Sequence, residues 1–109
     1  MPQAVKKVQD KTTRAIYAAL KTAFPEVPDD PGQVVYRYNP VAVRVRVISP
    51  KFVGKTSAER EAMVAAAFES LPPDATEDIT LQLMFTPREA KQRHQLLSRE
   101  FDDPTGEYL

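Results

Sequence analysis

The stretch that decides the fold is residues 41–48, which read VAVRVRVI. Its valines occupy every second position and alternate with other residues, among them Arg44 and Arg46. A period of two over eight residues, carried by β-branched side chains, is typical of a strand with one buried face. We therefore expect a strand over 42–48 whose valines face the core, while Arg44 and Arg46 lie on the opposite, open face.

Two further runs alternate in the same way and predict the partner strands. Residues 34–38 alternate until Asn39-Pro40 interrupts them, which predicts a strand near 34–38 and a hairpin turn near Asn39. Residues 79–85 read ITLQLMF, and apolar side chains stand at every second position of this run. This pattern predicts a third strand.

Three helices are predicted around these strands, over 4–24, 57–71 and 87–99. The first carries apolar residues at spacings of three, four and seven or eight, which give one apolar stripe. The other two begin with a capping box, a hydroxyl residue followed three positions later by glutamate, at Thr56–Glu59 and Thr86–Glu89. The predicted element order is therefore α–β–β–α–β–α.

The length and the element order indicate one α+β domain. The chain has 109 residues, which is the usual size of a single domain. Three strands and three helices suit a two-layer sandwich, in which helices cover one face of the sheet and the other face is partly solvated. We expect the single domain 1–109 to have a core over about 4–100 and a polar tail over 102–109.

The composition excludes several kinds of chemistry. Fifteen basic residues balance fifteen acidic ones, so no net field attracts nucleic acid or an anionic membrane. Cysteine is absent, which excludes disulfides, thiolate metal sites and thiol catalysis. One imidazole cannot make a metal site, and the lone histidine, His94, is expected to be a surface residue of the last helix. We expect no metal, no cofactor and no enzymatic activity.

No segment has the length and apolar character of a membrane span. Residues 1–7 also lack the apolar core of a secretion signal. The expected location is therefore cytoplasmic.

The strand at 42–48 leads without a gap into a loop and a helix with a distinctive pattern. The residues that carry it are Val43–Ile48, Phe52, Gly54, Arg60, Met63 and Val64. This block resembles the BolA-like family, whose pattern is an apolar strand, a loop with Phe, any residue and Gly, and a helix with an arginine and an apolar pair. Residues 79–89 are similar to that family's last strand and closing helix. The resemblance implies a fold like the second class of KH domains, with a three-stranded mixed sheet whose helices lie on one face.

One position departs from the family. Its signature histidine, which follows the arginine, is Glu61 here, and the loop at 38–41 holds neither histidine nor cysteine. In BolA-like proteins these positions are implicated in sharing an iron–sulfur cluster with a monothiol glutaredoxin. Glutamate is a poor substitute for imidazole or thiolate at such iron. The resemblance therefore implies the fold and a glutaredoxin-like protein partner, but no cluster.

Two groups of residues are candidate binding sites. The first is a strip of three arginines interleaved with Tyr36 and Tyr38, which could take phosphates and stacked bases on an open sheet. Its members are Arg37, Arg44 and Arg46. The alternative is a solvated face on which these arginines pair with acidic residues.

The second candidate is the corner that faces the partner in the BolA-like family. Its members are Phe52, Gly54, Arg60 and Glu61. Local explanations exist here as well, because Gly54 permits a positive φ and Glu61 favours the helix dipole.

Two functions follow from these candidates. The first is a non-catalytic adaptor that binds a protein partner, and the second is a nucleic-acid-binding module that uses the arginine and tyrosine strip. Nucleic-acid-binding domains are typically basic, whereas the isoelectric point here is about 6.6. We therefore favour the adaptor, and we expect neither nucleic acid nor a membrane as the natural partner.

Overall fold

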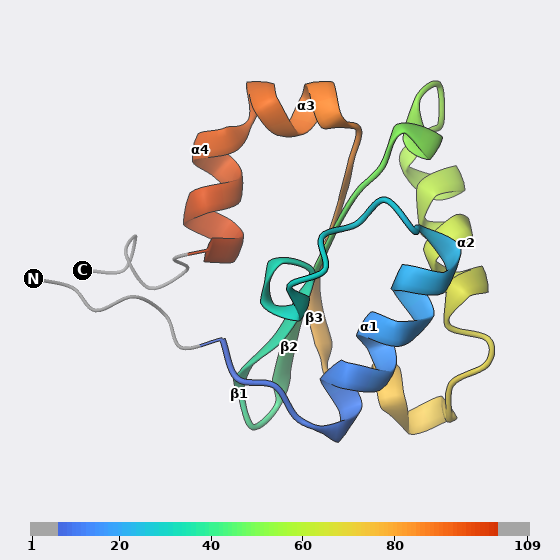
Figure 1. Cartoon of the computed structure of the whole chain (residues 1–109), viewed down its shortest axis with the longest axis vertical. Helices are drawn as coiled ribbons and strands as arrows, with labels where there is room; N and C mark the ends of the chain where they lie inside the picture. The colour runs from blue at the N-terminus through green and yellow to red at the C-terminus, as the bar shows by residue number, and fades with distance from the viewer. Residues whose placement is uncertain (1–6, 103–109) are drawn as a thin grey trace, which may run out of the picture.

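The computed structural model describes residues 7–102 and is an α+β fold with a three-stranded mixed sheet (Figure 1). The strands and helices are β1 (Val35–Asn39), β2 (Ala42–Ile48), β3 (Ile79–Phe85), α1 (Lys11–Ala23), α2 (Ser57–Ala67), α3 (Pro87–Gln92) and α4 (His94–Leu97). The predicted α+β class and all three predicted strands are confirmed. None of the helices described in 7–102 is long and apolar enough to cross a membrane.

The sheet has the order β1-β2-β3, so the alternating strand β2 is central. β1 pairs antiparallel to β2, with Val35 opposite Val45, and β3 pairs parallel to β2, with Phe85 beside Ile48. The valines within β2 are fully buried, as predicted. Val41 is the exception and is 70% exposed, because it belongs to the hairpin turn and its amide donates to the side chain of Asn39.

The main core lies between the sheet and the first two helices. Ile16 and Leu20 on α1, Val64 on α2 and Phe52 from the loop before α2 are all fully buried against the valine face of β2. Phe24 follows α1, and its ring centre lies 5.4 Å from that of Phe52. The apolar stripe that the sequence predicts for α1 is therefore the stripe that covers this face.

The helices differ from the predicted ranges at their ends. α1 begins at Lys11, because Asp10 caps it and accepts a hydrogen bond from the Thr13 amide. Val8 does not continue the helix and instead forms an isolated β-bridge with Arg37, while residues 4–6 of the predicted helix lie outside the described part. α2 ends at Ala67 instead of 71.

The predicted helix over 87–99 is in fact two helices followed by a turn. The chain bends at Arg93, where α3 ends and α4 begins, and Ser98–Asp102 then forms one π-helical turn. Asp102 therefore belongs to the fold and not to the predicted tail, of which residues 103–109 lie outside the described part.

The second face of the sheet is covered, which corrects the expectation of helices on one face only. Figure 1 shows α1 and α2 on one side of the sheet and α4 on the other. Leu97 of α4 and Phe101 of the following turn are buried there. Arg46 is only 7% exposed beneath them, so the face that it occupies is not open. The apolar pair explains the covering, because each side chain loses its contact with water by packing onto the sheet.

Candidate functional site

The three arginines of the predicted strip do not share one face. Arg37 lies opposite Val43 in the antiparallel pair, whereas Arg44 lies opposite Tyr36. Directly opposed residues on neighbouring strands project to the same face. Arg37 is therefore on the α1 side of the sheet, and Arg44 and Arg46 are on the α4 side. The expectation of one continuous strip is wrong. Arg37 pairs with Val43, and Val43 is an odd number of positions from Arg44 and from Arg46, so its side chain points to the opposite face.

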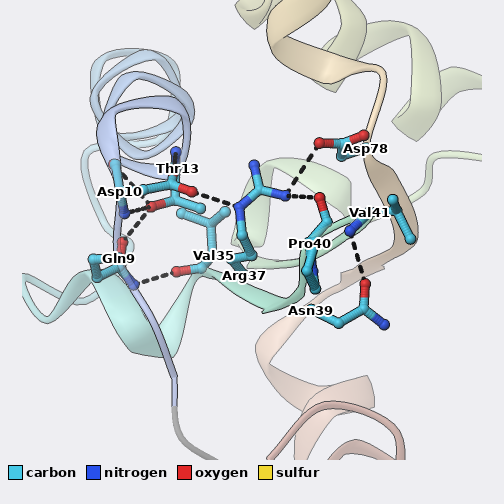
Figure 2. A network of polar contacts seen from close by, with 9 residues as sticks. All are labelled: Gln9, Asp10, Thr13, Val35, Arg37, Asn39, Pro40, Val41 and Asp78. Carbon is cyan, nitrogen blue, oxygen red and sulfur yellow. Dashed lines mark hydrogen bonds and ion pairs between the residues drawn. The ribbon is translucent and has the colours of Figure 1, made fainter.

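Arg37 is fully engaged with acidic and carbonyl groups (Figure 2). Its guanidinium donates to Asp10, to Asp78 at 3.1 Å and to the carbonyl of Pro40 at 3.1 Å. Burial opposes ionisation of Asp10, but the Thr13 amide and the Arg37 guanidinium outweigh it and lower the pKa of this carboxyl. For Arg37, pairing with acidic residues is therefore confirmed.

Arg44 and Arg46 lie under the turn at Ser98–Asp102. Arg46 donates to Asp102 at 3.1 Å and to the carbonyl of Gln33 at 3.0 Å. Arg44 donates to the carbonyl of Glu100 at 3.2 Å, and its guanidinium carbon lies 4.4 Å from the centre of the Tyr38 ring.

Tyr36, which lies opposite Arg44 in the sheet, is also enclosed. Tyr36 is fully buried and its hydroxyl donates to the carbonyl of Phe101. Burial raises the pKa of Tyr36 to about 12. The side chains that the sequence predicts for base stacking are therefore occupied by the chain itself in this structure.

The second predicted group comes together at the loop before α2. Gly54 has a φ of +76°, as its predicted role requires, and Phe52 is fully buried beneath the loop. The Arg60 guanidinium carbon lies 5.7 Å from the centre of the Phe52 ring. Glu61 is exposed on α2 and does not contribute to the cleft described below.

Arg60 is an anchor between α2 and α3. It donates to both carboxylate oxygens of Glu89, at 2.6 and 3.1 Å, and to the carbonyls of Met84 and Lys55. The hydrogen bond from Arg60 is the main reason that the pKa of Glu89 falls to about 2, and the Thr86 amide contributes as well. Because its donors are used in this way, Arg60 holds the corner in shape rather than presenting a charge to a ligand.

A cleft of about 410 Å³ opens beside this anchor. Its lining residues are Val53, Gly54, Arg60, Thr86, Pro87, Arg88, Glu89 and Gln92. Val53 is 66% exposed at its edge. The cleft thus combines an exposed apolar residue with a frame of fixed geometry.

Sequence reasoning missed most of this cleft. It singled out Gly54 and Arg60, but not Val53 or the start of α3 at Pro87 and Arg88. A signal was available, because the carboxyl ends of parallel neighbouring strands meet at one edge of a sheet. The parallel pairing of β2 with β3 therefore brings the loop after β2 to the loop after β3.

A larger hollow of about 570 Å³ lies between α1 and α2. Its lining is mainly alanine and includes no charged side chain. Binding sites use a few convergent polar groups to orient a ligand. The polar lining residues of the hollow are Thr22, whose hydroxyl donates to the carbonyl of Ala18, and Ser70. The smaller cleft has charged as well as polar lining residues, so it is the better candidate.

The described residues also give no support to a metal centre. Within 7–102 there is no group of three or more His, Asp or Glu side chains that could hold a metal ion. His94 is exposed on α4, as predicted.

Comparisons with known proteins give no independent assignment. No protein-family model matches the sequence, and neither the curated proteins nor the solved structures give a significant match.

Proposed function

We propose that this protein is a non-catalytic adaptor with a BolA-like, class II KH-like fold, and that it binds a protein partner at the cleft beside Val53 without an iron–sulfur cluster. The observation that carries the proposal is the exposed Val53 at the edge of a cleft of about 410 Å³. An exposed apolar side chain beside a shaped hollow offers surface that a partner can remove from water.

The frame of the cleft supports binding because it is already ordered. Thr56 and Thr86 each cap a helix through a reciprocal hydrogen bond with the glutamate three positions later. The Arg60–Glu89 pair then fixes one helix start against the other. A site that is ordered before binding loses less conformational entropy when the partner arrives.

The chemistry of the cleft supports an adaptor rather than an enzyme. Its ionisable lining residues are Arg60, Arg88 and Glu89. The low pKa of Glu89 keeps it ionised at neutral pH, and its oxygens accept hydrogen bonds from Arg60 and the Thr86 amide. A general acid or base needs a pKa close to the working pH, which Glu89 lacks.

The resemblance to BolA-like proteins supplies the first partner to test, a monothiol glutaredoxin. Gly54 and Arg60 are both family positions and cleft residues. Glu61 stands where the family has its histidine, and the chain has no cysteine, so a cluster would lack its usual ligands on this side. We therefore expect binding that does not depend on iron.

The alternative, a nucleic-acid-binding module, has weaker support. Its arginines lie on two faces of the sheet, and Arg46 is buried. The tyrosine and arginine side chains of the α4 side are in contact with the chain's own turn.

The test is site-specific photocrosslinking in the native host. A photoreactive phenylalanine analogue at Val53 should label one discrete protein, whereas the same analogue at Val41 should not. Val41 is a matched control, since it is 70% exposed at the opposite end of β2. Val53→Asp should then weaken binding of the purified partner about tenfold in the presence of a chelator, a typical loss for an anchor residue. Identical labelling from both positions, or binding that requires iron, would refute the proposal.

A further inference from the structure

The sheet face on the α4 side is charged under its cover. We call the covering turn, Ser98–Asp102, the strap. Lys7, Arg44 and Arg46 all contact the strap from below. The carboxylate that pairs with Lys7 and Arg46 is Asp102, which belongs to the strap itself. Without the strap, this face would therefore present three cations.

The strap binds this face as a ligand would, through a carboxylate and a ring. One oxygen of Asp102 lies 2.8 Å from Lys7 Nζ, and the other lies 3.1 Å from Arg46 Nη1. The Phe101 ring meets the Tyr36 ring edge to face, with centres 5.0 Å apart, and the Arg46 guanidinium carbon lies 4.2 Å from its centre. The ring is thus contacted by Tyr36 and Arg46, and the carboxylate by Lys7 and Arg46.

The peptide backbone of the strap is recognised as well. The Tyr36 hydroxyl donates to the carbonyl of Phe101, and Arg44 Nη1 donates to the carbonyl of Glu100 at 3.2 Å. Both bonds come from side chains and not from a neighbouring strand. Both donors are thus satisfied by main-chain carbonyl oxygens, which are acceptors that any peptide segment offers.

A purely structural cover would not need these charges. Burying Arg46, whose side chain is 8% exposed, costs desolvation free energy, and an apolar contact of the same size is often at least as stable. Arg44 Nε is buried and has no hydrogen-bond partner among the residues that the structure describes. Single π-helical turns are rare and occur frequently at functional sites.

From these contacts we propose that the Arg44–Arg46 face is a recognition site for a partner peptide that carries an aromatic residue followed by a carboxylate, and that the strap is its built-in occupant. This surface is separate from the cleft beside Val53, so the inference does not rest on the function proposed above. A partner segment of the same chemistry would take the place of the strap.

Competition with the strap sets the affinity of such a partner. A tethered segment acts at an effective concentration of about millimolar order. The apparent dissociation constant for a free peptide is the intrinsic value divided by the fraction of molecules in which the strap is open. Weakening the strap should therefore strengthen binding of a peptide in trans.

The experiment uses the full chain and a labelled peptide, acetyl-SREFD-amide, which reproduces the strap. Fluorescence anisotropy should show at least about tenfold tighter binding to the double variant Phe101→Ala, Asp102→Ala than to wild type, because the competing segment is weakened. The peptides SREFN and SREAD should bind the double variant more weakly than SREFD. Glu69→Ala, which removes one exposed negative charge far from the strap in sequence, is the control and should bind like wild type.

Two further variants keep the test decisive. If the double variant does not fold by circular dichroism, Asp102→Asn replaces it, because this change removes the charge and keeps the shape. Adding Arg46→Gln to either strap variant should abolish binding of SREFD. The proposal is overturned if wild type and the strap variants bind equally or not at all, if binding survives Arg46→Gln, or if a single-stranded oligonucleotide binds where the peptide does not.

Discussion

Gly54 shows what a single residue contributes to the cleft. Its φ of +76° lies in the left-handed region, which residues with a Cβ rarely adopt. A Cβ added there would meet no atom within 4 Å, so the constraint comes from the backbone alone. The glycine lets the loop after β2 turn towards the start of α2, and this turn places Val53 at the edge of the cleft.

Replacing Gly54 should therefore cost stability through backbone strain. We expect Gly54→Ala to lower the free energy of unfolding by about 1 kcal/mol, the cost of the left-handed conformation for an L-residue. Gly32→Ala is the control, since an added Cβ there would have only ordinary contacts, the nearest at 3.6 Å. Urea denaturation of both variants checks the prediction, and an equal effect of the two changes would contradict it.

Among the elements, the pair α2 and α3 is joined by one side chain with two tasks. Glu89 accepts a hydrogen bond from the Thr86 amide at 2.9 Å as part of the α3 cap. It also accepts hydrogen bonds from the guanidinium of Arg60 on α2. Its carboxylate is thus the link between the two helix starts that frame the cleft.

This link should depend on pH. The pKa of Glu89 falls from 4.5 to about 2 on folding, so its carboxylate stabilises the fold above pH 4.5 and loses this effect as the pH falls towards 2. We expect Glu89→Gln to be less stable than wild type at pH 6, with a difference that shrinks steadily between pH 4.5 and 2. Melting temperatures of both proteins across this range measure the difference. A gap that stayed constant with pH would show that the charge of Glu89 is not involved.

Across the whole molecule, Arg37 connects segments that are far apart in the sequence. Figure 2 shows its guanidinium between Asp10, which precedes α1, the hairpin at Pro40, and Asp78, which precedes β3. Only the folded chain brings these three segments together. Arg37 therefore acts as a tie at one end of the sheet.

Removing this tie should destabilise the whole fold. Hydrogen bonds to charged groups contribute about 1.5–3 kcal/mol when buried, but the side chains of Asp10 and Asp78 are 36% and 41% exposed and can regain water. We therefore expect Arg37→Leu to cost about 1–2 kcal/mol in the free energy of unfolding. Arg14→Leu on the exposed surface of α1 should change it by less than about 0.5 kcal/mol. Guanidinium denaturation compares the two, and a cost no larger for Arg37 than for Arg14 would contradict the role.

The charge balance of the molecule leads to a prediction about nucleic acid. Fifteen acidic residues offset fifteen basic ones, and Arg37 and Arg46 already pair with carboxylates. At physiological salt we expect no binding to single strands tighter than about the micromolar range of generic charge. Anisotropy with a labelled oligonucleotide over a range of salt concentrations measures this. Tight binding that weakens steeply with salt would favour the nucleic-acid-binding module over the adaptor.

The sequence by itself determined the strands and the starts of α2 and α3, because these depend on near neighbours. The alternation in 42–48 identifies β2, and the capping boxes at Thr56 and Thr86 mark the starts of α2 and α3. Such signals act over two to four residues, the distances that strand and helix geometry repeat. The start of α1 was predicted wrongly, because Val8 fits the helical pattern but pairs with Arg37, which is distant in the sequence.

The tertiary structure alone decided which surfaces are open. Arg44 and Arg46 look like one exposed strip in the sequence, but the strap covers them through contacts 56 residues away along the chain. The cleft likewise exists only because the parallel pairing of β2 and β3 brings two loops to one edge of the sheet. A local pattern states which side chains share a face of an element, whereas burial of that face depends on packing between distant segments, which no local pattern encodes.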